Sequence, residues 1–390
     1  MKFTTFSALF LFFLSACALR PPSQVILPSE IPIPYTATQP PPTATLIPPT
    51  PTPTVQISDD SIADIQAWLT DLADQDLFTG SILIAQEGKI LLADGYNLAD
   101  RTNNLPNTAT TRFKIGSITK QFTAMAVMIL AGQGKLSIED PICAYLEDCP
   151  ASWAAVTIRH LLTHTAGIHD YLDPNVWNPG GKPIGPDQIE EIIKSRPLDF
   201  QPGQSWSYSN TGYILLGRII EQVSDQSYEE FMQQNIFTPL ALHNTGFNNQ
   251  APNLAIGYDN GYTDLPAEEF LPTLLPLSDG GMISTVEDLY LWEQALSGET
   301  LVTQEQIVEM LSPLVRIPES DGMSYGFGWA VGEMFGHIVQ SHSGGVEGFS
   351  SFIFRFPDNQ ITIILLMNRY EVPFDSLFQV LMKKIFGPDR

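Results

Sequence analysis

The sequence has few basic residues. Lysine and arginine together number 19 against 43 aspartate and glutamate residues, and the formal net charge is −24. Nucleic acid and anionic lipid attract proteins mainly through positive charge, so this balance argues against partners that bind by that means, nucleic acid above all. The acidic residues are scattered along the chain, which is typical of a solvated acidic surface. No internal repeat is present, and 390 residues allow one large domain or two closely joined ones.

The apolar run at the N-terminus is short. It extends from Phe3 to Leu14, too short to span a bilayer as a mature helix but of the length of a secretory signal. It ends in the letters LSAC, which resemble the bacterial lipobox and contain Cys17. The resemblance implies removal of residues 1–16 and lipid attachment at Cys17, and so a lipoprotein on the extracytoplasmic side of a bacterial membrane. A plain signal peptide with an incidental cysteine is the alternative.

Residues 17–56 contain little that could form a core. Proline and threonine dominate the stretch, and no apolar periodicity is present. Such a composition favours extended polyproline II conformation over a packed fold. At about 3.1 Å per residue the stretch could hold a domain up to ~110 Å from a membrane. We therefore predict a lipid-anchored linker over 17–56 and a folded domain over 57–390.

Cysteine is scarce as well. Apart from Cys17, the chain has only Cys143 and Cys149. An exported protein folds where thiols oxidise, and two cysteines six residues apart can meet across a tight loop, so we predict a local disulfide. Two independent reduced thiols are the alternative. Because no second cysteine pair exists, a zinc site is not expected, and we expect no metal and no other cofactor.

The pattern of apolar residues predicts an α+β fold. Residues 59–75 have helical spacing, 80–97 read as a hairpin that turns at 87–89, and 118–300 are mostly helical and rich in loops. The C-terminal part returns to strands and ends in a helix, as the following ranges indicate: 325–332, 337–342, 349–356, 361–368 and 373–386. We predict one antiparallel sheet, flanked by helices and built from both termini, with a mainly helical subdomain inserted.

Two helix starts are expected in the middle of the chain. Residues 284–287 read Ser-Thr-Val-Glu, a capping box ahead of an apolar run. The other helix has Phe122, Met125 and Ile129 at helical spacing and opens on Gly116-Ser117. This second helix is unusual for a core helix because it carries a serine and a lysine near its positive end.

Ser117 and Lys120 lie three residues apart, so they share a helix face. A serine hydroxyl is a weak nucleophile until a base removes its proton, and burial would lower the pKa of Lys120 enough for it to share protons. The partial positive charge of the helix N-terminus would stabilise a developing alkoxide. Ser-x-x-Lys alone is weak evidence, because a chain of this composition is expected to contain about one such match by chance.

Two further stretches carry polar groups suited to a cleft. Tyr208 and Asn210 lie in a polar loop just before a helix expected to start around Thr211. His342 is followed by Ser343, Gly344 and Gly345 at the end of a predicted strand. Glycines there would let a substrate backbone approach closely and leave a main-chain N–H free to donate.

The ordered trio of Ser-x-x-Lys at Ser117, Tyr-x-Asn at Tyr208 and His-x-Gly at His342 resembles the class C β-lactamase-like serine hydrolases. That family includes β-lactamases, DD-carboxypeptidases, D-amino-acid peptidases and esterases. The stretches 156–168 and 278–292 resemble it too. The resemblance covers nearly all of the folded part and implies a β-lactamase/transpeptidase-like fold.

The resemblance also implies roles for the residues of the trio. Ser117 would be the nucleophile that becomes acylated, Lys120 would keep the proton network poised, and Tyr208 would be the general base that passes the proton to the leaving group. His342 completes this expected catalytic set. The substrate-binding residues it implies are Asn210, Ser343, Gly344 and Gly345, with an oxyanion hole formed by the backbone N–H groups of Ser117 and Gly345.

One departure bears on the substrate. True β-lactamases of this family usually have Lys-Thr-Gly where this chain has His342-Ser343-Gly344, and a histidine is largely neutral at pH 7. Peptidase or esterase action therefore ranks above antibiotic hydrolysis, on a small molecule or peptide with an amide, lactam or ester carbonyl. The alternatives are a true β-lactamase and a penicillin- or peptidoglycan-binding sensor without turnover. We expect the catalytic domain to be monomeric.

Other polar and aromatic residues admit simpler interpretations. His160 and His164 are four apart and could share a helix face, with His169 nearby, but the sequence lacks His-Glu-x-x-His, so helix-capping and loop-fixing roles are favoured over metal binding. Aromatic residues that could line a cleft are Tyr171, Trp177 and Trp206, whereas Tyr325 and Trp329 are expected in the core.

Overall fold

The computed structural model describes residues 55–173, 186–258, 278–369 and 374–387. The chain divides into two units, Met1–Pro53 and Thr54–Arg390, and all described residues belong to the second. The expected signal peptide, Cys17 and nearly all of the expected linker lie outside the described residues. Within the described ranges, no helix combines the length and the apolar character that a membrane span requires.

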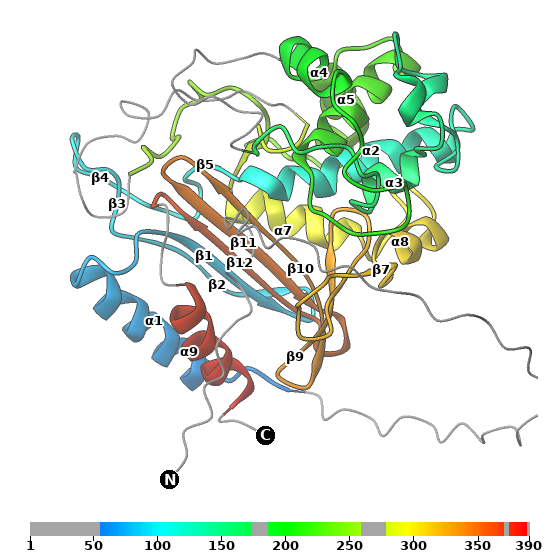
Figure 1. Cartoon of the computed structure of the whole chain (residues 1–390). Helices are drawn as coiled ribbons and strands as arrows, with labels where there is room; N and C mark the ends of the chain where they lie inside the picture. The colour runs from blue at the N-terminus through cyan, green and yellow to red at the C-terminus, as the bar shows by residue number, and fades with distance from the viewer. Residues whose placement is uncertain (1–54, 174–185, 259–277, 370–373, 388–390) are drawn as a thin grey trace, which may run out of the picture. The chain divides into compact units, whose positions relative to one another are not determined.

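An antiparallel sheet of eight strands forms the centre of the described unit (Figure 1). Its strand order is β2-β1-β12-β11-β10-β9-β8-β7. The strands are β1 (Gly80–Gln86), β2 (Lys89–Tyr96), β7 (Val315–Arg316), β8 (Ser324–Tyr325), β9 (Ala330–Met334), β10 (His337–Val346), β11 (Phe349–Phe356) and β12 (Ile361–Met367). The sheet is thus drawn from both ends of the domain, as the sequence predicts.

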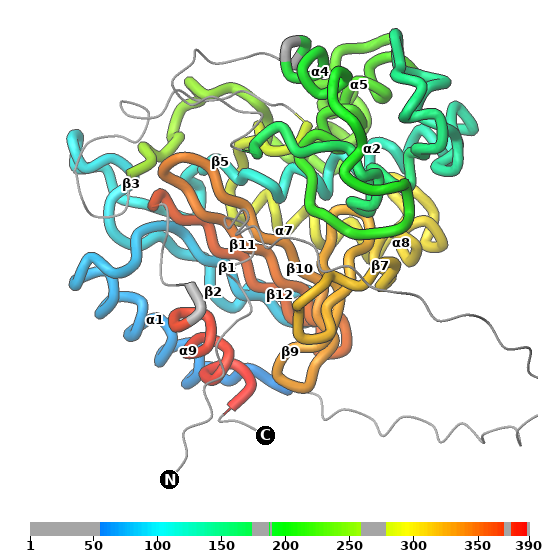
Figure 2. Tube along the Cα trace, in the orientation of Figure 1, coloured from blue at the N-terminus to red at the C-terminus, as the bar shows by residue number. Residues whose placement is uncertain are grey.

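Strands from the two ends of the domain lie side by side in this sheet. Figure 2 shows β1 next to β12, and the two are antiparallel with Ile82 opposite Leu365. Both strands are buried along their whole length, because each sheet face is covered by helices. β1 also pairs with β2 through the predicted hairpin, whose turn residues Glu87 and Gly88 have φ of +53° and +76°. This left-handed turn matches the right-handed twist of the strands it joins.

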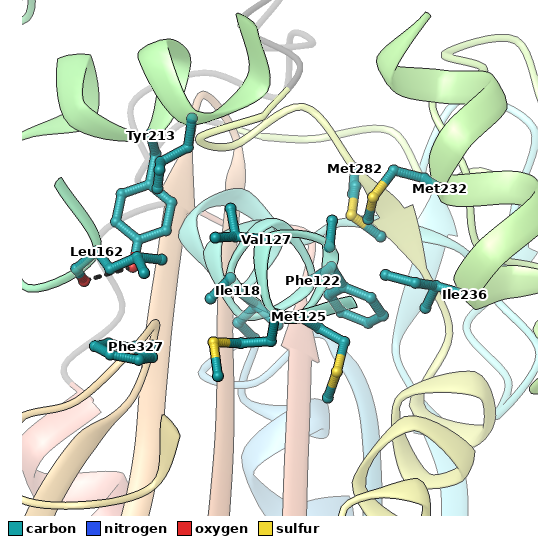
Figure 3. Packing of buried hydrophobic residues seen from close by; sticks show 14 of the residues in the cluster. Ile118, Phe122, Met125, Val127, Leu162, Tyr213, Met232, Ile236, Met282 and Phe327 are labelled. Carbon is teal, nitrogen blue, oxygen red and sulfur yellow. Dashed lines mark hydrogen bonds between the residues drawn. The ribbon is translucent and has the colours of Figure 1, made fainter. Parts of the chain in front are cut away.

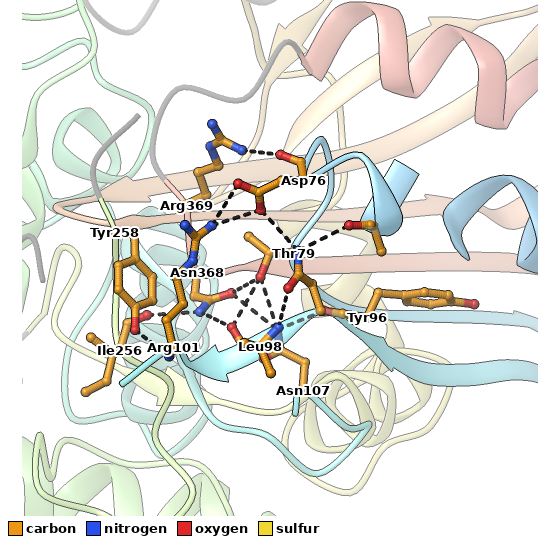
Figure 4. Close-up of polar contacts among 12 residues, drawn as sticks. Asp76, Thr79, Tyr96, Leu98, Arg101, Asn107, Ile256, Tyr258, Asn368 and Arg369 are labelled. Atoms are coloured by element: carbon orange, nitrogen blue, oxygen red, sulfur yellow. Dashed lines mark hydrogen bonds and ion pairs between the residues drawn. The ribbon is translucent and has the colours of Figure 1, made fainter. Parts of the chain in front are cut away.

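A buried polar cluster joins the first and last strands of the domain (Figure 4). Asn368 is fully buried just after β12. Its side-chain oxygen accepts from the Thr79 hydroxyl at 2.9 Å, and its amide nitrogen donates to the carbonyl oxygens of Leu98 and Ile256, both at 3.0 Å. Buried polar groups are costly unless paired, so this one side chain ties three distant segments together.

Helices cover both faces of the sheet. Side chains alternate between faces along a strand, and on β11 Phe354 stacks on Phe378 of α9 at 4.4 Å between ring centroids. The next residue, Arg355, points to the other face and pairs with Glu293 of α7, with Nε–Oε1 at 2.7 Å. The helices are α1 (Asp59–Asp74), α2 (Thr119–Gly132), α3 (Ile158–Leu162), α4 (Pro186–Lys194), α5 (Asn210–Ser224), α6 (Tyr228–Met232), α7 (Val286–Ala295), α8 (Gln304–Met310) and α9 (Phe374–Phe386).

The helix α2 runs through the middle of the core (Figure 3). Twelve of its residues, Thr119 through Leu130, are buried, and Phe122 stacks on Trp292 at 4.1 Å between centroids. The apolar periodicity read from the sequence therefore marks a helix that is enclosed on all sides. A helix so placed can hold polar groups at its N-terminus in a nearly dry environment.

The start of α7 lies one residue later than the sequence pattern predicts. Thr285, not Ser284, is the N-cap, and its hydroxyl accepts from the backbone N–H of Asp288 at 3.1 Å. Ser284 instead closes the short strand β6 (Ile283–Ser284), which pairs with β5 (Phe113–Lys114). The predicted capping box is wrong because this strand pairing, made by a segment far away in the sequence, extends the chain through Ser284. The remaining two-stranded pair is β3 (Leu98–Asp100) with β4 (Leu105–Pro106).

A disulfide joins Cys143 and Cys149, with S–S at 1.99 Å. The bridge closes a loop between two short helical turns, η2 (Ile142–Ala144) and η3 (Ala151–Trp153). The loop lies after α2 and before α3, in the helical part of the domain. A covalent link of this kind restricts the unfolded chain and so stabilises the loop.

Candidate active site

Ser117 lies in a tight turn between β5 and α2. The turn is a 3₁₀ helix, η1 (Gly116–Ile118), and the α-helix begins only at Thr119, so the serine precedes the α-helix that the sequence predicts it to open. Gly116 has φ of +49°, and a Cβ there would lie 2.8 Å from the backbone nitrogen of Gly345. Glycine is needed at this position because a side chain would meet both strain and backbone.

Lys120 is fully buried one turn further on. Its ammonium donates to the Ser117 hydroxyl at 3.0 Å, to Oδ1 of Asn210 at 2.8 Å and to the backbone carbonyl of Asp279 at 2.7 Å. Burial lowers the pKa of Lys120 to about 8, although the charges of Asp279 and Asp170 oppose the change. A lysine with such a pKa can both lose and regain a proton near neutral pH.

Tyr208 and Asn210 reach Lys120 from the start of α5. Ser209 is the N-cap of this helix, which places the two neighbouring side chains toward the buried lysine. The Tyr208 ring centroid is 5.0 Å from Nζ of Lys120. Burial raises the pKa of Tyr208 well above 10, while a hydrogen bond with Ser117 opposes the rise. The phenol is therefore neutral at neutral pH.

The glycines of β10 pack directly on the serine turn. A Cβ at Gly344 would lie 2.1 Å from the carbonyl oxygen of Ile115 and 2.9 Å from the backbone nitrogen of Ser117. Gly345, the next residue, is exposed. The backbone nitrogens of Ser117 and Gly345 therefore lie on either side of the same close contact. Glycine at position 344 is needed, because a side chain there would hold β10 away from the serine turn.

The hydrogen bonds of His342 define its tautomer. Its Nδ1 is 2.6 Å from the carbonyl oxygen of Ser343, and since a carbonyl only accepts, Nδ1 carries the hydrogen. Nε2 then accepts from the Tyr325 hydroxyl at 2.9 Å. Burial and the charge of Lys120 lower the pKa of His342 to about 3. Tyr325 is buried, as expected of a core residue, but it also holds this imidazole.

Two carboxyl groups beside Lys120, those of the buried Asp279 and the half-buried Asp170, were not predicted from the sequence as part of this site. Oδ2 of Asp279 accepts from the Tyr171 hydroxyl at 3.0 Å, and burial raises the pKa of Asp279 to about 6. Asp170 accepts from the side chain and the backbone N–H of Asn210, each at 3.1 Å. Asp279 falls within the stretch 278–292 that resembles the family, so its position before two glycines was the available signal.

The histidines of 160–169 do not share one helix face. His160 completes a capping box with Thr157 at the start of α3, but His164 lies beyond the end of that helix with φ of +59°. The His164 ring packs 4.3 Å from the Tyr208 ring. No group of three or more potential metal ligands occurs in the described part of the chain, and Trp177 lies outside it.

A surface cavity of about 640 Å³ lies away from these residues. Its lining includes Arg112, His243 and Phe247 but none of the three motifs. The Arg112 guanidinium donates to Oδ1 of Asn244 at 2.8 Å and to the carbonyl of Pro252. Its hydrogen bonds therefore stabilise the segment 244–252. We assign no chemistry to this cavity.

Known proteins resemble the chain over most of its length. The β-lactamase family model matches residues 65–379. Penicillin-binding protein 4* of Bacillus subtilis (strain 168) is 33% identical over 327 residues, which cover 79% of this chain and 72% of that protein. The octameric penicillin-binding protein homologue from Pyrococcus abyssi has 28% identity, a TM-score of 0.72, and coverage of 82% and 77% of the two chains.

A D-stereospecific amidohydrolase from Streptomyces sp. is also similar, with 26% identity, a TM-score of 0.68, and coverage of 83% of this chain and 98% of that one. These matches confirm the β-lactamase/transpeptidase-like fold that the motifs predict. Together with the meeting of three distant motifs at one serine, they show that this chain belongs to the β-lactamase family and is a serine hydrolase of that family.

Proposed function

We propose that the protein hydrolyses D-amino-acid peptides or simple esters through an acyl-enzyme on Ser117. The observation that carries the proposal is the set of contacts at Lys120, whose ammonium joins Ser117 to Asn210 of a second motif, while the glycines of the third motif pack on the serine turn. The Streptomyces relative, named a D-stereospecific amidohydrolase, supports this substrate class.

In the acylation step, neutral Lys120 accepts the hydroxyl proton of Ser117 across 3.0 Å, and the serine oxygen bonds to the substrate carbonyl carbon. The backbone N–H groups of Ser117 and Gly345 stabilise the oxyanion that forms. Removing one such donor typically slows a reaction by ~10²–10³-fold. The resemblance implies that Tyr208 is the base, but a phenol whose pKa lies well above 10 holds its proton, so we assign the first proton transfer to Lys120.

Tyr208 then acts as a relay to the leaving group. Its phenol gives a proton to the departing amine or alcohol and takes one from Lys120, while the carbonyl carbon loses its bond to that nitrogen or oxygen. In the second half, water attacks the acyl carbon, its proton passes back through the same pair, and Ser117 leaves as a hydroxyl. Asn210 would hydrogen-bond the substrate amide, and Ser343 would hold the substrate along β10.

Two other functions remain as alternatives. A true β-lactamase would use the same acylation chemistry on a lactam, but the histidine of the third motif offers no fixed positive charge to a substrate carboxylate. A sensor that binds penicillin or peptidoglycan would stop at the adduct. The presence of nucleophile, lysine and tyrosine in contact favours turnover over a sensor.

Intact-protein mass after incubation with an activated ester or a fluorescent penicillin tests these functions. A transient adduct with steady product release is expected, and Ser117→Ala should abolish both the adduct and the turnover. A permanent adduct would indicate a sensor. An adduct that survives Ser117→Ala would refute the assignment of the nucleophile.

A hydrolysis panel then separates the substrate classes. The panel contains a chromogenic cephalosporin, short-chain nitrophenyl esters and D-Ala-D-Ala peptides, each with wild type and Tyr208→Phe. We expect ester or peptide hydrolysis to exceed cephalosporin hydrolysis, and we expect Tyr208→Phe to slow release of a poor leaving group such as an amine more than release of nitrophenol. Efficient cephalosporin turnover would favour the β-lactamase alternative.

We further propose that lipid on Cys17 anchors the domain on the extracytoplasmic side of a bacterial membrane, through the linker 17–56. The lipobox-like letters LSAC support this, as does the bacterial origin of the Bacillus relative. Radiolabelled palmitate should be incorporated by the wild type, whereas Cys17→Ala should remain unlabelled and leave the membrane fraction. We expect residues 57–390 to be monomeric, which light scattering would measure.

A further inference from the structure

The charges around the nucleophile are mostly negative. Lys120 is the only lysine or arginine among the described residues whose charge shifts the pKa values of Asp279, His164 and His342. An ammonium has three hydrogens to donate. All three are engaged by protein acceptors at 2.7 to 3.0 Å, so Lys120 has none left for a substrate carboxylate.

His342 cannot supply the missing cation. Nδ1 donates to the Ser343 carbonyl, and Nε2 accepts from the Tyr325 hydroxyl, so both ring nitrogens are occupied and the imidazole is neutral. A proton added at Nε2 would bring a second positive charge toward Lys120 in a buried setting. His342 occupies the strand position at which β-lactamases of this family usually have the lysine of Lys-Thr-Gly. This position is therefore uncharged in this protein.

Three carboxyl groups converge on the same region. Asp279, Asp170 and Glu347 all raise the pKa of Tyr171 by their charges, after the larger effect of burial. Glu347 lies in the turn between β10 and β11, two residues after Gly345. Oδ2 of Asp279 accepts from Tyr171, but its Oδ1 is fully buried and has no hydrogen-bond partner among the described residues.

We propose that this site selects acyl donors with a free ammonium group close to the scissile carbonyl, and that it discriminates against donors with a carboxylate there. The inference rests on the proposed acyl-enzyme chemistry at Ser117 and narrows its substrates to amides and esters of amino acids whose amino group is free. An ammonium would be attracted by the negative charges of Asp170, Asp279 and Glu347, while a carboxylate would meet like charges without a cation to receive it.

Three D-alanine p-nitroanilides with the same leaving group test this selection at pH 7. Their α-nitrogen is a free ammonium, an acetyl amide or a succinyl amide, so the acyl part is positive, neutral or negative. We expect kcat/KM to fall in that order, by about tenfold or more between the first and the last. Equal values or the reverse order would overturn the proposal.

Uncharged p-nitrophenyl acetate separates this test from that of the proposed function. Hydrolysis that depends on Ser117 but shows no preference among the anilides would refute the selection alone. Absence of Ser117-dependent hydrolysis of the acetate would refute the proposed chemistry itself.

Charge-removing variants test which carboxyl groups are responsible. Asp279→Asn and Glu347→Gln should each narrow the ratio of kcat/KM between the ammonium and succinyl substrates. Asp358→Asn is the matched control, because Asp358 is exposed in η6 (Pro357–Asn359) at the opposite end of β11 and its loss should leave the ratio unchanged. Since Asp279→Asn could impair folding, the half-buried Glu347 provides an independent variant. A ratio that neither active-site variant changes, or that Asp358→Asn changes equally, would contradict the proposal.

Discussion

Lys120 is the residue whose burial most directly supports the proposed chemistry, because burial lowers its pKa. The enclosed helix α2 places its ammonium out of water, and three hydrogen bonds to uncharged oxygen atoms stabilise it there. Its pKa of about 8 means that it is mostly protonated at pH 7 but readily becomes a base. The backbone carbonyl of Asp279 and the side-chain amide of Asn210 fix the position of this ammonium, and its third acceptor is the Ser117 hydroxyl.

The first prediction concerns the pH dependence of the reaction. If neutral Lys120 is the base, kcat/KM on p-nitrophenyl acetate should rise from pH 6 to pH 9 with a midpoint near a pKa of about 8, because the lowered pKa makes the amine available in that range. The groups that surround the amine and affect its charge are Asp279 and Asp170. Initial rates corrected for spontaneous hydrolysis measure the profile.

A matched pair of lysine variants completes this test. Lys120→Arg keeps the charge but cannot lose its proton, so kcat should fall by about 10²–10⁴-fold, the usual contribution of a general base. Lys135→Arg changes an exposed lysine after the end of α2 and should have wild-type activity. A flat profile between pH 6 and pH 9, or an active Lys120→Arg, would show that another group accepts the proton.

Sequence reasoning identified the residues of the three motifs because their spacing is local. Ser117 and Lys120 are one helical turn apart, and Tyr208 and Asn210 flank an N-cap. It did not identify Asp279 as a neighbour of Lys120, because the contact between them joins segments 159 residues apart. The sequence correctly predicts that Tyr325 is a core residue, but it does not show that its hydroxyl bonds His342, because that partner lies on another strand.

At the level of elements, the site depends on the contact between β10 and the serine turn. Because Gly116 and Gly344 have no side chains, the backbone of the serine turn and that of β10 lie so close together that a Cβ at either position would clash. The backbone N–H groups of Gly345 and Ser117, on the two sides of this contact, are the donors that we propose for the oxyanion. Their close approach therefore places both donors beside the nucleophile.

The second prediction tests this contact. Gly344→Ala would put a Cβ 2.1 Å from the Ile115 carbonyl oxygen, so β10 must move away from the turn, and kcat/KM should fall by about 10²–10³-fold, as for loss of an oxyanion donor. Gly298→Ala is the control, since the nearest atom to its Cβ would be at 3.8 Å. Equal activity of the two variants, both shown to be folded by circular dichroism, would contradict the proposed role of the contact.

At the scale of the whole domain, the centre of the sheet is formed by strands from opposite ends of the sequence. β1 and β12 lie side by side and are fully buried, so neither end of the domain can form its part of the core alone. The polar cluster around Asn368 fixes the register at the end of these strands. Long-range pairing of this kind is formed late and slowly in folding.

The third prediction concerns the contribution of the cluster at Asn368 to the stability of the domain. Asn368→Ala removes the acceptor of the Thr79 hydroxyl and the donor to the carbonyls of Leu98 and Ile256. Because these buried groups would lose their partners, the free energy of unfolding should fall by about 3 kcal/mol. Urea denaturation with the disulfide intact measures the change.

An exposed asparagine serves as the control for stability. Among the described residues, the side chain of Asn103 donates a hydrogen bond to Asp100 alone, at the end of β3, so Asn103→Ala should change the free energy of unfolding by less than about 0.5 kcal/mol. If both variants were equally stable, the cluster at Asn368 would not be what joins the two ends of the domain.

The sequence by itself determined the chemistry that is available and the type of each element. Alternating apolar residues and helical spacing are local patterns, and they sufficed for the hairpin of β1 and β2, for the strands β10, β11 and β12, and for the helix behind Ser117. The single strand predicted over 325–332 is wrong, because this range folds into two short strands, β8 and β9, that pair with each other. Only the tertiary structure decided the charge of the site. Whether His342 is neutral, whether Tyr208 keeps its proton and which carboxyl groups face Lys120 depend on burial and on contacts between distant segments, and no local pattern of residues contains that information.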